Sequence, residues 1–259
     1  YAHAFKGESA GVDYGMSFAG VNRNKRSINL DLKHPDDREI MLKLCESADA
    51  VVENMRSGVM DSLDLGFETI LKRNPTIVYG AVRGYGDPRT GESPYAHWPS
   101  LDPVGQSTAG LVEATGDTWG VAIADIYPGT LMALGLLAAV HRARATGKGE
   151  FFDVAMYDGA LSLLKSNVTS YSLIRKDTGP RKNALVPFEL FDTTDGRIAI
   201  AAPVERHWQT LCKAMQRDDL IDDERTRTNP RRVANREFCN GQINAWTQSR
   251  SKAEVLEAL

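Results

Sequence analysis

Residues 120–140 read GVAIADIYPGTLMALGLLAAV and hold a single carboxylate, Asp125, where a short apolar segment gives way to a helical run. The run from Thr130 to Val140 has almost no polar face, so we expect a helix that is buried on most sides. A carboxylate at the entrance of such a helix lies near unpaired backbone N–H groups and the positive end of the helix dipole. We expect this place to keep Asp125 ionised even where water is scarce. The alternative interpretation is a plain N-cap without chemistry.

The segments on both sides of this helix predict an α/β fold. Apolar alternation and short β-branched runs indicate strands at 26–32, 50–54, 76–82 and 151–155. Helical patterns follow at 35–48, 67–72, 102–111 and 158–174. Strands that alternate with helices at this spacing are typical of a parallel sheet, so we predict a Rossmann-like parallel α/β domain.

A polar segment with proline and glycine, RKDTGPRK at 175–182, predicts a domain boundary. We therefore assign residues 1–178 to a large domain and 183–259 to part of a smaller α+β domain. In the smaller domain, Thr193-Thr-Asp-Gly196 separates two apolar strands, and Asp-Gly is a strong β-hairpin signal. Helical patterns follow to the end of the sequence.

Composition narrows the function. The chain has 259 residues, 42% hydrophobic and 25% charged, with a net charge of -3, which is typical of a soluble globular protein. That charge gives no reason to expect nucleic acid or a membrane surface as a partner. We find no apolar run of the 18 residues that a membrane span needs. Cys45, Cys212 and Cys239 are widely spaced and predict reduced thiols in a cytoplasmic protein.

Several common sites have no sequence signature in this chain. It contains neither GxGxxG nor GxxxxGK[ST], so a dinucleotide or P-loop site is not expected. The five histidines show no HExxH spacing, so we expect no metal site and no permanently bound cofactor. The GxSxG elbow of many serine hydrolases is also absent. Carboxylate chemistry at Asp125 is the option that remains.

Several longer motifs, in order along the chain, carry a family resemblance. They are NRNKRSINLDLK at 22–33, ADAVVENM at 48–55, NPTIVYG at 74–80, AIAD at 122–125 and TGKGEFFDVAMYDGA at 146–160. Together they resemble the class III CoA-transferases, a family that also includes the α-methylacyl-CoA racemases. The resemblance implies a Rossmann-like large domain, a smaller domain and a homodimer of interlocked rings. It also implies that the family's first strand and C-terminal segment lie outside Tyr1–Leu259.

The resemblance assigns a catalytic role to Asp125, which matches the family's aspartate nucleophile. It implies transfer of CoA from an acyl-CoA to a carboxylic acid through an aspartyl mixed anhydride and an aspartyl-CoA thioester. Covalent catalysis of this kind divides one difficult exchange into easier steps. Coenzyme A and acyl-CoA would then be substrates of the enzyme.

Five further residues match CoA-binding segments of the family. Leu30 and Lys33 lie on the NLDLK segment, and Asn54, Met55 and Arg56 match a turn that holds the nucleotide end of CoA. Lys33 and Arg56 would supply positive charge to phosphates. For Leu30 and Met55, plain core packing is the alternative. Ser62 stands where formyl-CoA transferase has a CoA-contacting arginine, so we expect that contact to be lost or replaced.

Two other functions stay open at this stage. The racemases carry a histidine directly before the aspartate of the loop that here ends in Leu101-Asp102, so a two-base racemase would lack one base. His97 is four residues from Leu101, and an unexpected loop path would be needed for it to replace that base. A non-catalytic CoA-binding domain is the third reading. The sequence names neither the donor nor the acceptor acid, and cationic and dicarboxylate acceptors are both open.

Overall fold

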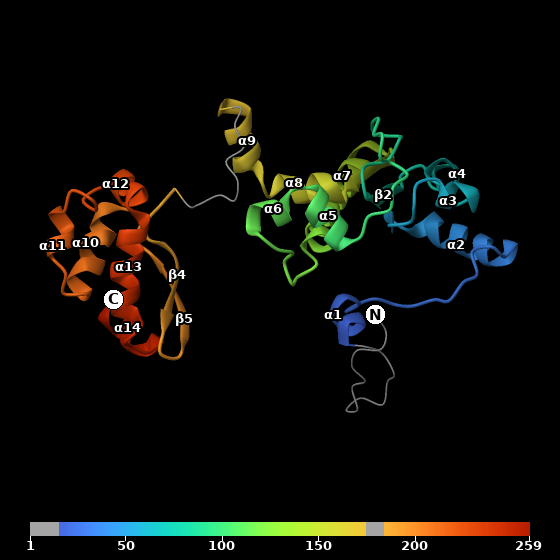
Figure 1. Ribbon diagram of the computed structural model, residues 1–259. Helices are drawn as coiled ribbons and strands as arrows, with labels where there is room; N and C mark the ends of the chain where they lie inside the picture. The colour runs from blue at the N-terminus through green and yellow to red at the C-terminus, as the bar shows by residue number, and fades with distance from the viewer. Residues whose placement is uncertain (1–15, 175–183) are drawn as a thin grey trace. The chain divides into compact units, whose positions relative to one another are not determined.

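The computed structural model describes residues 16–174 and 184–259 of the chain (Figure 1). The chain divides into two units, Tyr1–Asp177 and Thr178–Leu259. The domain boundary predicted between residues 178 and 183 falls outside the described residues, so it stays a prediction. Each unit has its own hydrophobic core and is described by itself.

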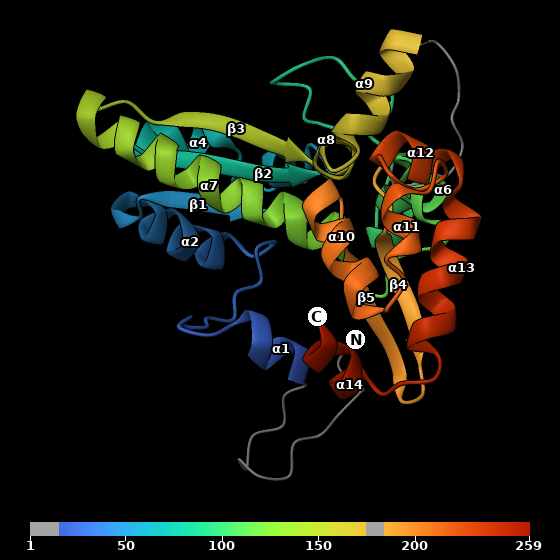
Figure 2. The same ribbon diagram turned by 90° about the vertical axis from the view of Figure 1, so that its left-hand side faces the viewer.

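Three parallel strands form the centre of the first unit. They are β1 (Ala50–Glu53), β2 (Val78–Arg83) and β3 (Glu150–Ala155), in the order β1-β2-β3 (Figure 2). The middle strand, β2, is buried along nearly its whole length, which explains its continuous apolar sequence. The predicted α/β fold with a parallel sheet is therefore confirmed.

Helices cover both faces of this sheet. On one face, α2 (Pro35–Ser47) and α4 (Phe67–Arg73) pack over Tyr79 and Phe151, whose ring centroids lie 5.6 Å apart. On the other face, α7 (Ile123–Thr146) packs over Val78 and Phe152. The alternation of side chains along a strand thus places one apolar set under each helical layer.

The remaining helices of this unit are short. They are α1 (Met16–Val21), α3 (Val59–Ser62), α5 (Asp102–Thr108), α6 (Leu111–Thr115), α8 (Met156–Ser162) and α9 (Lys165–Ile174). The single helix predicted over 158–174 is therefore two helices. The strand predicted at 26–32 is wrong as well. That segment is irregular, and Ile28 is 60% exposed, because no described strand pairs with it.

Helix α7 departs from its prediction in two ways. It begins at Ile123, seven residues before the predicted run, and it carries Pro128 inside its first turns. It is also less buried than expected, because Leu134 and Leu137 on its outer face are exposed. An 18-residue window of α7 is long and apolar enough to cross a membrane, and 22% of it is buried, so the prediction that no such run exists is wrong. Its contacts with β2 and β3 are those of a helix packed on a sheet.

The second unit is built on the predicted hairpin. Strands β4 (Phe188–Thr193) and β5 (Gly196–Ala201) are antiparallel, and Gly196 has φ 131°, a conformation that favours glycine. The helices are α10 (Glu205–Ala214), α11 (Asp219–Asp222), α12 (Asn229–Ala234), α13 (Arg236–Thr247) and α14 (Lys252–Ala258). Trp208 and Ile243 are central residues of the core between hairpin and helices. The Asp-Gly hairpin prediction is confirmed.

Candidate active site

Asp125 is the third residue of α7, in its first turn. The cap position belongs to Ala122, so the interpretation of Asp125 as an N-cap is wrong. The Asp125 side chain is exposed, and within the described residues no group donates a hydrogen bond to its carboxylate. A carboxylate at this place is free to meet a ligand.

Asp102, the first residue of α5, holds the start of α7 from outside that helix. One carboxylate oxygen, Oδ1, accepts a hydrogen bond from the backbone N–H of Ala124 at 2.8 Å. The other, Oδ2, accepts one from the side-chain amide of Gln106 at 2.8 Å. Gln106 is fully buried, and its Oε1 accepts the backbone N–H of Trp119 at 2.8 Å. Asp102 and Gln106 thereby fix the turn that leads into Asp125.

Although residue 125 is exposed, partial desolvation of its carboxylate, and then the nearby charge of Asp102, raise the pKa of Asp125 above its ordinary value. The sequence expectation was an ionised carboxylate at the helix start, and it included no direction for the pKa. A carboxylate with a raised pKa is a stronger base, and a stronger nucleophile once it is ionised.

Asp125 opens into a cavity of about 730 Å³. The turn of Asn54, Met55 and Arg56 lines the same cavity, so the structure brings three predicted CoA residues to the predicted nucleophile. The other lining residues come from β1, β2 and the residues that follow them, the loop before α5, α7 and α8. They are Val52, Glu53, Ser57, Val82, Arg83, Gly84, 96–101, Gly129 and Met156. This volume is in the range of small-molecule sites.

Arg83, at the end of β2, holds the Asn54–Arg56 turn in place. Its guanidinium is 5% exposed and donates to Glu53 at 2.6 and 2.9 Å, to Asp87 at 2.9 Å and to the carbonyl of Met55 at 2.8 Å. Glu53 in turn accepts the backbone N–H of Met55 at 2.7 Å. Sequence reasoning missed Arg83, although a charged residue at the end of a buried strand is the signal that could have identified it.

Leu30 and Lys33 do not line this cavity in the structure. Leu30 is half-buried and Lys33 is exposed, both in the irregular segment before α2. The backbone N–H of Lys33 donates to Asp31 Oδ1 at 3.0 Å, which fixes a local turn. Their proposed contacts with CoA therefore rest on the sequence.

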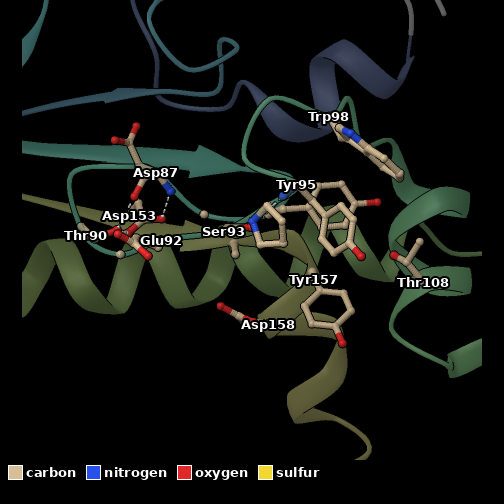
Figure 3. A pocket seen from close by; sticks show the side chains of 15 residues that line it. Asp87, Thr90, Glu92, Ser93, Tyr95, Trp98, Thr108, Asp153, Tyr157 and Asp158 are labelled. Carbon is tan, nitrogen blue, oxygen red and sulfur yellow. Dashed lines mark hydrogen bonds between the residues drawn. The ribbon is translucent and has the colours of Figure 1, made fainter.

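A second cavity, of about 810 Å³, has a different character (Figure 3). Tyr85, Tyr95, Trp98 and Tyr157 form one wall, with Tyr95 and Trp98 rings 4.8 Å apart. Carboxylates supply the charge of the other end, and none of the described residues that line it is basic. CoA phosphates need positive groups. The Asp125 cavity, with Arg56 in its wall, is therefore the better candidate for a CoA site.

The described parts of the chain, 16–174 and 184–259, hold no group of three His, Cys, Asp or Glu side chains placed to bind a metal ion. The three cysteines are buried, free thiols. Burial raises the pKa of Cys212 to about 12 and that of Cys239 to about 11, so both are protonated at neutral pH. Neither cysteine is an activated nucleophile.

Comparison with known proteins identifies a family. The model of CoA-transferase family III matches residues 5–259. The succinyl-CoA:mesaconate CoA-transferase of Haloarcula hispanica is 40% identical over 255 residues, which cover 95% of this chain and 64% of that protein. The acetyl-CoA:oxalate CoA-transferase of Acetobacter aceti is 32% identical over 257 residues, covering 95% and 65%. The chain thus spans slightly less than two thirds of these relatives.

A solved structure agrees with these sequence matches. The crystal structure of a CAIB/BAIF family protein from Brucella suis has a TM-score of 0.78 and 28% sequence identity. The likeness covers 91% of this chain and 64% of that one. The fold is therefore that of the structural relative over nearly the whole chain.

Proposed function

This chain belongs to CoA-transferase family III, and from that premise we propose that it moves CoA from an acyl-CoA donor to a carboxylic acid, with Asp125 as the nucleophile. The observation that carries the proposal is the cavity that Asp125 shares with the Asn54–Arg56 turn. The turn supplies a positive side chain for CoA, and the carboxylate has a raised pKa.

The proposed CoA exchange takes four steps, and the Asp125 carboxylate is restored at the end. The carboxylate attacks the carbonyl carbon of the thioester; the C–S bond breaks, CoA leaves as thiolate, and a mixed anhydride forms. The thiolate then attacks the Asp125 carbonyl carbon, which releases the donor acid and leaves an aspartyl-CoA thioester. The acceptor carboxylate displaces CoA thiolate from that thioester, giving a second anhydride. The thiolate finally attacks the acceptor acyl carbon, which yields the new acyl-CoA and restores the carboxylate.

We propose Arg56 for contact with CoA phosphates and Asn54 and Met55 for the neighbouring part of the nucleotide. Leu30 and Lys33 stay in the proposal on their sequence match alone. The relatives that act on mesaconate and oxalate favour a dicarboxylic acid as acceptor over a cationic one. The homodimer and the cytoplasmic location also stay predictions of the sequence.

A racemase is the second candidate, because His97 lines the same cavity as Asp125. The sequence interpretation required an unexpected loop path for this histidine. Leu101, at the position of the racemase base, is 73% exposed and also lines the cavity. His97 and Asp125 are therefore the two groups that could exchange an α-proton.

The test uses the full-length protein with a panel of acyl-CoA donors that includes succinyl-CoA and acetyl-CoA. Each mixture is treated with hydroxylamine or borohydride, and mass spectrometry follows the peptide that contains Asp125. We expect a donor-dependent adduct, which is lost in Asp125→Asn together with about 10³-fold or more of the transfer rate. The matched control is Asp117→Asn, which changes an exposed aspartate in the turn before α7. This variant should keep both the adduct and the transfer rate.

Other outcomes separate the alternatives. Bound CoA without an adduct, together with exchange of the α-proton into solvent deuterium, would establish the racemase. Bound CoA with an unchanged rate in Asp125→Asn would exclude Asp125 as the nucleophile.

A further inference from the structure

Ser100 carries a hydroxyl that the described structure leaves unused. Its Oγ is buried, and no partner within hydrogen-bond distance is found for it among the described residues. Ser100 also lines the cavity that contains Asp125. Buried hydroxyls in native proteins are nearly always paired, so an orphan in the wall of a ligand cavity points to a partner that a ligand supplies.

Two glycines pack close to Ser100. A Cβ at Gly84 would lie 2.8 Å from the Ser100 Cβ, so the backbone that follows β2 lies close to Ser100. On another side, a Cβ at Gly105 would lie 3.7 Å from Ser100 Oγ and 2.9 Å from the Cβ of Ala124. Gly105 therefore lies between Ser100 and the residue that directly precedes Asp125.

Hydrogen bonds of the same loop tie Ser100 to the nucleophile. Asp102, two residues after Ser100, accepts the backbone N–H of Ala124 at 2.8 Å. Ser100 and the backbone of Ala124, the residue before Asp125, are thus linked through Asp102 and Gly105 of α5. A hydroxyl keeps its donor direction free to rotate.

We propose that the Ser100 hydroxyl donates a hydrogen bond to the carbonyl oxygen of the acyl-CoA thioester that Asp125 attacks. This inference rests on the proposed transferase function. When the carboxylate adds to the carbonyl carbon, the C=O electron pair moves onto oxygen, and an oxyanion forms close to a second negative charge. A neutral donor that is already desolvated stabilises this oxygen more than a solvated one would. In the absence of substrate, the same hydroxyl has no partner.

The first variant is Ser100→Ala in the full-length protein. We expect kcat for transfer to fall by about 10²-fold, the usual effect of removing one oxyanion donor, while KM for the acyl-CoA changes little. The melting temperature of the ligand-free protein should not fall, because the change removes a hydroxyl that has no partner there. Ser100→Cys keeps the shape but donates poorly, and it should lose a similar share of the rate.

A spectroscopic measurement makes the donor visible. With Asp125→Asn to prevent turnover, the carbonyl stretch of a bound ¹³C-labelled acyl-CoA should lie at lower frequency than in the Asp125→Asn, Ser100→Ala double variant. The matched control is Ser107→Ala, whose hydroxyl donates to the carbonyl of Pro103 at 2.7 Å and does not line the cavity. Ser107→Ala should leave the transfer rate and the carbonyl stretching frequency unchanged.

The outcomes separate this inference from the function on which it rests. Full activity in Ser100→Ala, with Asp125→Asn inactive, would refute the role of Ser100 and leave the transferase intact. A fall in melting temperature together with the rate, or a change confined to KM, would assign Ser100 to structure or ground-state binding and would also refute it. Full activity in Asp125→Asn would refute the proposed function itself.

Discussion

Asp102 acts on Asp125 in two ways, through the backbone and through its charge. Its carboxylate accepts the N–H of Ala124, which positions the first turn of α7, and its negative charge helps to raise the pKa of Asp125. The two effects can be separated, because an asparagine at residue 102 keeps an acceptor oxygen and loses the charge. Asp102 is therefore a positioning residue with an electrostatic effect on the nucleophile.

We predict that Asp102→Asn shifts the acid limb of the pH profile of kcat/KM to lower pH. Asp125 must be ionised to attack, so activity is lost as the pH falls through its raised pKa. Removing the neighbouring negative charge makes ionisation easier and lowers that pKa. The profile should be measured from about pH 3 to pH 8 with one acyl-CoA donor, a range that contains ordinary carboxyl and histidine pKa values. Because the carboxylate is then a weaker base, the rate on the plateau should fall.

Gln106 and Asp117 provide the controls for this prediction. Gln106→Leu removes a buried partner of Asp102 but no charge, so it should reduce stability and leave the acid limb in place. Asp117→Asn removes an exposed charge; the Asp117 carboxylate accepts the backbone N–H of its neighbour Thr118. This variant should change neither the stability nor the acid limb of the pH profile. An acid limb that does not move in Asp102→Asn would show that another group titrates in it.

At the scale of elements, local sequence patterns predicted the central sheet and the β4–β5 hairpin well. Continuous apolar runs and Asp-Gly turns act over a few residues, so their signal is complete within the sequence. The strand predicted at 26–32 was wrong because alternation specifies a strand only where a partner is present. The start of α7 was also misplaced, since its first turn is held by Asp102, which is 22 residues away from Ala124.

The same difference between local sequence signals and tertiary contacts explains which residues of the site were predicted. Motif resemblance assigned a catalytic role to Asp125 and CoA binding to the Asn54–Arg56 turn, and the structure puts both in one cavity. Arg83 and Ser100 were not found, because one acts through ion pairs and the other through an unpaired hydroxyl, and both depend on tertiary contacts. The raised pKa of Asp125 was not predicted either, since it depends on desolvation and on the charge of Asp102, which the helix signal does not contain.

Helix α7 approaches the sheet closely at a glycine, and this contact gives a prediction about stability. A Cβ at Gly135 would lie 2.6 Å from Phe152 Cε2, so we expect Gly135→Ala to cost about 1–3 kcal/mol through overpacking. Gly129 lies on the same helix with nothing within 4 Å of a Cβ. Gly129→Ala should stabilise by about 0.5–1 kcal/mol through helix propensity. Urea unfolding measures both, and shifts of the same sign would contradict this packing.

At the scale of the whole molecule, every residue of the candidate site described here lies in the first unit. Asp125, Ser100 and the Asn54–Arg56 turn are held by the parallel sheet and its helices. The second unit has a separate apolar core around Trp208 and Ile243, which the β4–β5 hairpin and its helices enclose. Each unit therefore buries apolar surface without needing the other for its core.

Separate cores predict separate opening of the two units, which hydrogen exchange can measure in the full-length protein. Ile243 is fully buried in the second unit, and Ile243→Ala should cost that unit about 2–5 kcal/mol. Exchange in α13 should then accelerate, while the amides of β2 keep their protection. The reciprocal variant is Ile77→Ala, fully buried under α2 and α4, which should expose β2 and leave α13 protected. If either variant accelerated exchange in both units equally, the molecule would unfold as one cooperative body, and the cores would depend on contacts between the units.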